Sequence, residues 1–438
     1  MTSPSFEIAL ERIHQAPNLS VSGRVTQVVG LVIESNGPNA RIGDSCWIET
    51  GSEVVQAEVV GFRGDRVLMM PLGDLAGARA GSIAHATGHC VSVPVGPSLM
   101  GRVLDGLGQP ADGGPALETH RRIPVHNSAP NPMSRAMIQR PVATGVRAID
   151  AMLTIGEGQR VGIFAGSGVG KSTLLGMIAR GTSADVNVIA LIGERGRELR
   201  EFIENDLGPE GLARSVLVCA TSDECAMVRV KAAYTATAIA EYFRDQGLSV
   251  MLMMDSVTRF AMAQREIGLA IGEPPSTKGY TPSVFAALPK LMERAGTNSK
   301  GAITGLYTVL VEGDDASEPI SDAARSILDG HIMLSRSLAA KGHYPPIYLP
   351  HSLSRVMPMV ADDDHVETAR KLRELIAAYG EVEDLVAIGA YKEGAKPLAD
   401  RALKRWDKIN GFLRQSRNEM TPLDAAIEGL KGVVHEEV

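Results

Sequence analysis

The chain has 438 residues, too many for one ordinary hydrophobic core, and this length predicts two or three domains. Its net charge of -7 argues against a dedicated nucleic-acid-binding protein, because such proteins usually carry a basic footprint. No segment reaches the roughly 18 apolar residues that a membrane span needs. The sequence therefore predicts a cytoplasmic protein that reaches a membrane only peripherally, through partners.

The first part of the chain predicts a short helix followed by a small β-barrel. Apolar residues at helical spacing over 2–16 predict an amphipathic helix, which either frays or packs on its own domain, or docks a partner. We assign 1–18 to this helix and 19–93 to the barrel, because short β-rich runs there alternate with Gly, Asn and Asp. The runs cover 23–34, 45–48, 54–62 and 66–71.

A glycine-rich loop after the apolar run 161–164 predicts a site for nucleotide phosphates. The loop reads Ala165, Gly166, Ser167, Gly168, Val169, Gly170, Lys171, Ser172 and Thr173. Its glycines let backbone N–H groups turn toward phosphate oxygens, Lys171 reaches the outer phosphates, and the Ser172 hydroxyl can ligate Mg²⁺. The usual pattern begins with Gly where this chain has Ala165. The three remaining glycines predict that the loop survives the change.

Strand-like and helix-like segments alternate after residue 140, which predicts an α/β fold with a parallel sheet covered on both faces. The predicted strands are 160–164, 186–192, 216–220 and 249–254, and the predicted helices follow Lys171 and lie around 199–206 and 227–245. From residue 362 onward the pattern is helical. These features predict a nucleotide-binding domain over 94–361 and a C-terminal helical domain over 362–438.

Two carboxylates are placed where a nucleotide enzyme would use them. Asp255 ends the apolar run 250–254, and a Mg²⁺-nucleotide enzyme needs a carboxylate opposite its phosphate loop. Glu194 follows the run 188–192, at the strand edge where open α/β sheets bind ligands. Position alone leaves Glu194 open between a general base that polarises water and a solvated charge at a helix start.

Four motifs, taken in order, make the sequence similar to the catalytic subunits of rotary ATP synthases and their relatives. They are the phosphate loop, Gly-Glu-Arg-Gly-Arg-Glu at 193–198, Asp-Ser-Val-Thr-Arg-Phe at 255–260, and the run 345–355. Within that superfamily, segments at 272–275, 279–285, 288–291 and 293–296 resemble the branch that energises type III protein export. Ile-Gly-Ala-Tyr at 388–391, with Gly394, is more similar to the flagellar members than to the injectisome members.

The resemblance covers most of the chain and implies a fold and a set of catalytic roles. The implied fold is a RecA-like P-loop ATPase core, preceded by a small N-terminal β-barrel and followed by a C-terminal helical domain. Lys171 would contact the β and γ phosphates, Ser172 would bind Mg²⁺, Asp255 would hold the metal through water, and Glu194 would polarise the attacking water. The phosphates or the developing charge would be contacted by Arg195 and Arg259.

Two further roles follow from the run at 345–355 and the residue before it. Tyr344 falls where the family stacks an aromatic ring on adenine. Arg355 falls where relatives carry an arginine that reaches the nucleotide of the neighbouring subunit, a contact worth roughly 10³ to 10⁵ in rate. Tyr348 stands where the family usually has Asp, so the run departs from the family pattern between these two residues.

The resemblance also implies an assembly and partners. We expect a homohexamer that hydrolyses ATP with Mg²⁺ and supports flagellar protein export at the inner membrane. Expected partners are a soluble stator-like regulator, a coiled-coil protein like a central stalk, the membrane export gate, and complexes of export chaperones with substrates. The acidic residues Asp314, Asp315 and Glu318 either face that stalk or form a solvated loop.

Other readings of the motifs are an injectisome ATPase, an ATP synthase catalytic subunit, a hexameric RNA translocase and an inactive ring subunit. The first 93 residues contain no cluster of aromatic and basic residues for stacking bases, so we expect no nucleic acid. Retention of Lys171, Glu194, Asp255 and Arg355 together argues against an inactive subunit. The four cysteines include no C-x-x-C pair, which favours reduced thiols over metal ligands.

Overall fold

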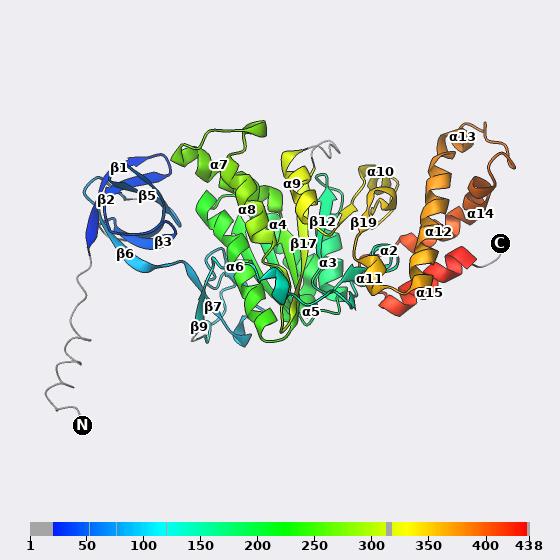
Figure 1. Ribbon diagram of the computed structural model, residues 1–438, viewed down its shortest axis with the longest axis horizontal. Helices are drawn as coiled ribbons and strands as arrows, with labels where there is room; N and C mark the ends of the chain where they lie inside the picture. Colours follow the sequence, from blue (N-terminus) through cyan, green and yellow to red (C-terminus); the bar gives the residue numbers. More distant parts are fainter. Residues whose placement is uncertain (1–20, 52, 76, 120, 312–317, 436–438) are drawn as a thin grey trace, which may run out of the picture. The chain divides into compact units, whose positions relative to one another are not determined.

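The computed structural model describes residues 21–51, 53–75, 77–119, 121–311 and 318–435 (Figure 1). The chain divides between Val91 and Ser92 into two compact units. The helix predicted at 2–16 and the acidic residues Asp314 and Asp315 lie outside the described residues. Within the described ranges, none of the helices combines the length and the apolar character that crossing a bilayer requires.

The first unit is a closed six-stranded barrel, as the sequence predicts. Around the barrel the strands run β1 (Ser22–Val29), β2 (Val32–Asn36), β5 (Arg66–Pro71), β4 (Val54–Arg63), β3 (Asp44–Glu49) and β6 (Ile83–Cys90). The single run predicted at 23–34 is in fact a hairpin, because Gly30 adopts a left-handed φ of 57° and turns the chain between β1 and β2.

The barrel is closed by β6, which the sequence pattern does not predict. This strand reads Ile-Ala-His-Ala-Thr-Gly-His-Cys, and its small and polar residues carry little β-propensity. It nevertheless pairs with both β1 and β3, so tertiary pairing decides its conformation. Its Ala84 is fully buried beside core residues of the other strands, including Ile33, Ile48 and Met69.

The second unit is built on a largely parallel sheet. The strand order is β19 (Leu353–Ser354), β18 (Gly330–Met333), β12 (Arg160–Ala165), β17 (Ala302–Leu310), β15 (Ser249–Asp255), β13 (Val186–Glu194), β14 (Ser215–Thr221) and β8 (Val103–Asp105), with β16 (Gly296–Thr297) paired off the edge of β17. Only β16 and β19 run antiparallel to their neighbours. The parallel strands therefore all end on the same side of the sheet. The phosphate loop follows the carboxyl end of β12 on that side.

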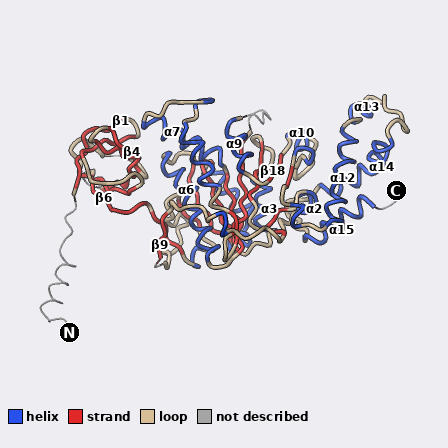
Figure 2. The backbone as a smooth tube through the Cα atoms, in the orientation of Figure 1, coloured by secondary structure: helices blue, strands red, loops and turns tan. Residues whose placement is uncertain are grey.

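Helices cover both faces of this sheet, as the sequence predicts (Figure 2). Along β13 the side chains alternate, and Ile189 and Leu191 join the apolar cluster that contains Leu174 and Ile178 of α3 (Lys171–Gly181). On the other face, α6 (Ala226–Asp245) packs against β13, β14 and β15. The sheet strands are thus buried on both sides, which explains their nearly continuous apolar sequences.

The remaining helices of this core connect or flank the strands. They are α2 (Arg147–Met152), α7 (Val257–Ile271), α8 (Pro282–Met292), α9 (Pro319–Ile327), α10 (Arg336–Ala340) and α11 (Met357–Val360). The helix predicted at 199–206 is part of a longer helical stretch made of α4 (Gly196–Glu201), a π-helical turn (Phe202–Leu207) and α5 (Gly208–Ala213). Two short antiparallel ribbons, β7 (Ser92–Val95) with β9 (Arg121–Pro124) and β10 (Pro141–Val142) with β11 (Ile155–Gly156), complete the unit.

A buried ion pair links α6 to the chain after α8. Arg294 donates two hydrogen bonds of 2.8 Å to the carboxylate of Glu241, and both side chains are almost fully buried. Arg294 also donates to the carbonyl oxygen of Val125 at 2.7 Å. A buried charge is tolerated only when it is paired and hydrogen-bonded, and removing one partner of such a pair typically costs about 3 to 5 kcal/mol. This pair therefore fixes the segment that leads from α8 into β17.

The C-terminal region is helical, as predicted, and consists of α12 (Asp363–Gly380), α13 (Glu383–Ala387), α14 (Pro397–Leu413) and α15 (Leu423–His435). Tyr379 of α12 stacks on Trp406 of α14 with 3.5 Å between ring centroids. Leu372, Ile409 and Leu430 belong to the same apolar cluster as the nucleotide-binding core. Because the two regions share one core, the boundary predicted at residue 362 stays a prediction.

Candidate active site

The phosphate loop lies between the end of β12 and the start of α3. Gly168 and Gly170 have left-handed φ values of 76° and 90°, which side chains with a Cβ rarely adopt. Gly170 caps α3 without any side-chain hydrogen bond, so the first N–H groups of the helix have no side-chain acceptor. A helix start of this kind attracts anions through its free N–H groups and its dipole. The predicted residues therefore form a loop suited to nucleotide phosphates, including Ala165, whose side chain is buried at the end of β12.

The two predicted carboxylates converge on Lys171. The Nζ atom of Lys171 lies 2.5 Å from Oδ1 of Asp255 and 3.6 Å from Oε1 of Glu194. Asp255 is the last residue of β15 and Glu194 the last of β13, so neighbouring parallel strands bring them to the same sheet edge. This arrangement joins a cation that can bind phosphate with two carboxylates that can hold a metal or accept a proton.

The electrostatics of the three groups are strongly perturbed. Burial opposes the charge on Lys171, but Asp255 and Glu194 outweigh it and raise the pKa of the ammonium group. Burial, reinforced by the nearby charge of Asp255, raises the pKa of Glu194, although Lys171 partly offsets the shift. A carboxylate whose pKa rises toward neutrality is better matched to accepting a proton at physiological pH.

Two threonines that the sequence analysis missed organise this edge. Thr308 of β17 donates from Oγ1 to Oδ1 of Asp255 at 2.8 Å, and it is fully buried. Thr258 accepts a hydrogen bond of 2.9 Å from the backbone N–H of Leu310 and so ties the start of α7 to the end of β17. A polar residue inside the apolar strand 302–310 was the available signal for Thr308.

Arg259 lies beside Gly193, the residue before Glu194, whereas Arg195 does not join the cluster. The aliphatic part of the Arg259 side chain packs over Gly193, where an added Cβ would lie 3.1 to 3.4 Å from it. Its Nε atom is buried and makes no hydrogen bond within the described residues. Because buried donors are normally hydrogen-bonded, this atom is available to donate to an anionic ligand. The Arg195 side chain is 81% exposed and pairs with Glu198 at 3.5 Å.

Tyr344 lies beside the phosphate loop, on the side of Gly170. An added Cβ at Gly170 would lie 3.7 Å from Cε1 of the Tyr344 ring, and the ring is half-exposed. The backbone carbonyl of Tyr344 accepts a hydrogen bond of 2.9 Å from the N–H of Gln415, just beyond α14. The ring is thus held next to the loop with one side open, as stacking on a base requires.

Arg355 lies at the opposite end of β12 from the phosphate loop. Its backbone N–H donates to the carbonyl oxygen of Asp329 at 3.0 Å, and the Asp329 N–H in turn donates to Arg160, the first residue of β12. From Arg160 to Ala165 the strand covers about 16 Å at the usual rise of a parallel strand. The Arg355 backbone is therefore too far from its own phosphate loop for its side chain to serve that loop.

Comparison with known proteins places these features in a family. Residues 145–354 match the nucleotide-binding domain of the ATP synthase alpha/beta family, and residues 25–88 match the β-barrel domain of the same family. The flagellum-specific ATP synthase of Bacillus subtilis (strain 168) is 54% identical over 418 residues, which cover 95% of each chain. The chain belongs to the ATP synthase α/β family. It is an ATPase of the flagellar and type III secretion group.

Other relatives of this ATPase come from both export systems. The type 3 secretion system ATPase of Xanthomonas euvesicatoria is 52% identical over 98% of each chain. Residues 361–432 match the C-terminal domain of the T3SS EscN ATPase. The structure of the assembled ATPase EscN from enteropathogenic E. coli has 47% identity and a TM-score of 0.89, and the match covers 94% of this chain and 100% of the chain in that structure. These matches confirm the barrel, the P-loop core and the helical C-terminal region that the sequence predicts.

The donor set of the ATPase fits Mg²⁺ bound together with nucleotide phosphates. Ser172 offers an exposed hydroxyl in the first turn of α3, and Asp255 offers a buried carboxylate. Within the described residues no cluster of three or more His, Cys, Asp or Glu side chains forms a metal cage. Mg²⁺ usually relies on one or two protein oxygens, water and substrate phosphates, so this set suits it. Of the four free cysteines, Cys46 is buried and the other three are half-buried.

Proposed function

We propose that this ATPase works as a homohexamer that hydrolyses MgATP at sites between subunits and energises flagellar protein export. The observation that carries the proposal is the separation of Arg355 from its own phosphate loop along β12. Arg355 is exposed and cannot reach a nucleotide on the phosphate loop of its own subunit. It can contribute to catalysis if a second copy of the chain brings its phosphate loop to the Arg355 side chain. Lys171, Glu194 and Asp255 of that second copy would complete the site.

The proposed roles follow from the geometry of each group. Lys171 leaves its carboxylate partners for the phosphates when nucleotide enters, which frees Glu194 to accept a hydrogen bond from the attacking water. Ser172 and Asp255 hold Mg²⁺, which neutralises charge on the phosphates when it is bound. Arg259 contacts the phosphates with its unpaired Nε, and Tyr344 stacks on adenine. Arg195, which points to solvent here, would reach the phosphates only after its pair with Glu198 opens.

The assembly is tested by measuring ATPase activity per chain against protein concentration, with mass photometry on the same samples. We expect specific activity to rise steeply where hexamers form, because each site needs Arg355 of a neighbour. Lys171→Ala is the control that should assemble and yet stay inactive at every concentration. Activity that is independent of concentration in a monomeric protein would contradict the shared site.

Flagellar export is favoured over injectisome secretion by the Ile388 to Tyr391 segment alone, because flagellar and injectisome relatives are about equally similar to the chain. The choice is tested in two bacterial hosts, one lacking its flagellum-specific ATPase and one lacking its type 3 secretion ATPase. We expect the chain to restore export of flagellar subunits in the first host and not effector secretion in the second, with Lys171→Ala as the negative control in both. The reverse pattern would assign it to an injectisome.

The proposed partners are a coiled-coil stalk, a soluble regulator, the membrane export gate and chaperone complexes. The stalk is supported by the structure of EscN in complex with its central stalk EscO, which matches this chain with a TM-score of 0.88 at 46% identity. Of the acidic residues considered for that contact, Glu318 has a different role in the described chain. Its carboxylate caps α9 by accepting from the N–H of Ser321 and from the hydroxyl of Tyr280, both at 3.3 Å.

A further inference from the structure

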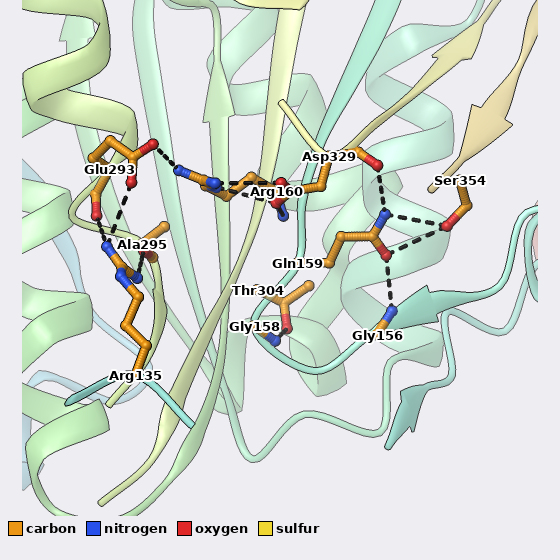
Figure 3. A network of polar contacts seen from close by, with 10 residues as sticks. All are labelled: Arg135, Gly156, Gly158, Gln159, Arg160, Glu293, Ala295, Thr304, Asp329 and Ser354. Carbon is orange, nitrogen blue, oxygen red and sulfur yellow. Dashed lines mark hydrogen bonds and ion pairs between the residues drawn. The ribbon is translucent and has the colours of Figure 1, made fainter. Parts of the chain in front are cut away.

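A network of polar contacts reaches Ser354 of β19, the residue directly before Arg355 (Figure 3). It lies at the amino end of β12, away from the phosphate loop, and runs from the end of α8 through β12 to β18 and β19. Its members include two residues that the sequence analysis did not single out, Gln159 and Arg160. The nucleotide chemistry described above does not use either of them, so their burial and their hydrogen bonds call for another explanation.

Gln159 contacts the two groups that hold the Arg355 backbone in place, namely the preceding residue Ser354 and the carbonyl of Asp329. Its Nε2 donates to Oγ of Ser354, the residue before Arg355, at 3.1 Å. The same nitrogen donates to the carbonyl oxygen of Asp329 at 3.3 Å, and this oxygen also accepts the backbone N–H of Arg355. A carbonyl oxygen has two lone pairs, so both donors are accommodated at once. Gln159 itself is fully buried and is fixed by the N–H of Gly156, which donates to its Oε1 at 2.9 Å.

Arg160 holds the side chain of the same aspartate. Its Nε and Nη2 atoms donate to the two carboxylate oxygens of Asp329 at 3.1 and 3.3 Å, and its Nη1 pairs with Glu293 at 2.5 Å. Glu293 is held in turn by Arg135, whose Nη1 also donates to the carbonyl of Ala295 at 2.8 Å. Asp329 is thus hydrogen-bonded through its side chain to Arg160 and through its backbone carbonyl to Gln159. These contacts restrict the position of the carbonyl.

We propose that Gln159 is a positioning residue for Arg355, through which each subunit sets the geometry of its neighbour's active site. The inference rests on the proposed function, because it assumes that Arg355 acts across a subunit boundary. The Arg355 side chain is exposed and follows directly after the two-residue strand β19 at the sheet edge, and such a strand has few hydrogen bonds of its own to fix the position of the next residue. The two hydrogen bonds of the Gln159 amide fix the backbone position of Arg355 instead. Gln159 also directly precedes β12, the strand that leads to the subunit's own phosphate loop.

The test replaces Gln159 with Leu, which keeps a similar volume but removes both amide donors and the acceptor. Misplacement of a reacting group by about 1 Å can cost on the order of 10²-fold in rate, so we expect kcat to fall at least about tenfold. The KM for ATP should change less than about twofold, because the residue does not touch the subunit's own nucleotide. Thr304→Val is the matched control, since Oγ1 of the buried Thr304 accepts from Gly158 in the same turn at 2.9 Å without contacting β19.

Mixed rings separate positioning from general damage. Gln159→Leu subunits keep an intact phosphate loop and Glu194, whereas Glu194→Gln subunits keep an intact Arg355 and its supports. We expect mixing the two inactive or weak variants to raise activity per Gln159→Leu subunit, because some of its sites then face a well-placed Arg355. No gain on mixing, or a raised KM with unchanged kcat, would overturn the proposal and make Gln159 a residue of its own subunit's site.

Two further variants keep the test decisive. If Gln159→Leu does not fold, Ser354→Ala removes one of the two contacts of the same amide with a smaller change, and the same fall in kcat and the same rescue are expected. Arg355→Ala is assayed alongside. If it keeps full turnover, the action of Arg355 across subunits fails and both proposals fall. If it is inactive while Gln159→Leu and Ser354→Ala are fully active, only the positioning inference is wrong.

Discussion

The variant Glu194→Gln is expected to bind MgATP nearly as well as the native chain and to turn it over at least about 10²-fold and up to about 10⁴-fold more slowly. Glutamine has the same shape as glutamate but cannot accept a proton from the attacking water. The loss should appear in kcat, with little change in nucleotide affinity, because Lys171 and the loop N–H groups remain. Burial and the charge of Asp255, which raise the pKa of the Glu194 carboxyl, act only on the native side chain.

The measurement combines steady-state ATPase assays with binding of a fluorescent nucleotide to the same preparation. Glu201→Gln is the matched control, because Glu201 lies in the helix after Glu194 and pairs with Arg197 on the exposed surface at 3.0 Å. Such a surface ion pair contributes little to the stability of the fold, so this control variant should keep its ATPase activity. Undiminished turnover by Glu194→Gln would remove Glu194 from the mechanism, and loss of binding would make it a residue of the binding site instead.

Replacing Arg355 with Ala is expected to leave the fold and nucleotide binding nearly intact and to lower hexamer activity by roughly 10³-fold or more. The side chain is exposed in the single chain, and its backbone N–H, which the substitution keeps, donates to the carbonyl oxygen of Asp329. Within the described residues, truncation therefore removes no hydrogen bond or ion pair of the Arg355 side chain. Under the proposed assembly, the loss would be that of a positive charge near the transferring phosphoryl group of the neighbouring site.

Mixing Arg355→Ala with Glu194→Gln subunits shows on which site the arginine acts. Neither variant alone is active, but a mixed ring contains sites built from Glu194 of one variant and Arg355 of the other, so activity should return. Arg370→Ala serves as the control, because Arg370 is exposed and its ion pairs in the described part of the chain run along its own helix, to Glu367 and Glu374. A mixture that stays inactive, although mass photometry shows mixed hexamers, would contradict action across the subunit boundary.

Local sequence determined the elements on which the chemistry depends. The phosphate loop was predictable because glycine tolerates left-handed φ values, and Gly168 and Gly170 adopt them. Asp255 and Glu194 were predictable as a pair because each ends an apolar strand, and the carboxyl ends of parallel strands share one edge of a sheet. The same local rules failed for β6, whose weak strand propensity is overridden by pairing on both sides.

What only the tertiary structure decided is which distant residues meet. Thr308 reaches Asp255 because β17 lies next to β15, and Gln159 reaches Ser354 and Asp329 because β18 and β19 fold back beside β12. No local pattern encodes such contacts, because they depend on strand order and register, which are set by long-range packing. The sequence by itself therefore determined a phosphate-binding ATPase of a recognisable family. The tertiary structure decided that Arg355 stands at the far end of β12 from its own phosphate loop, because strand pairing brings β19 to the amino ends of β18 and β12.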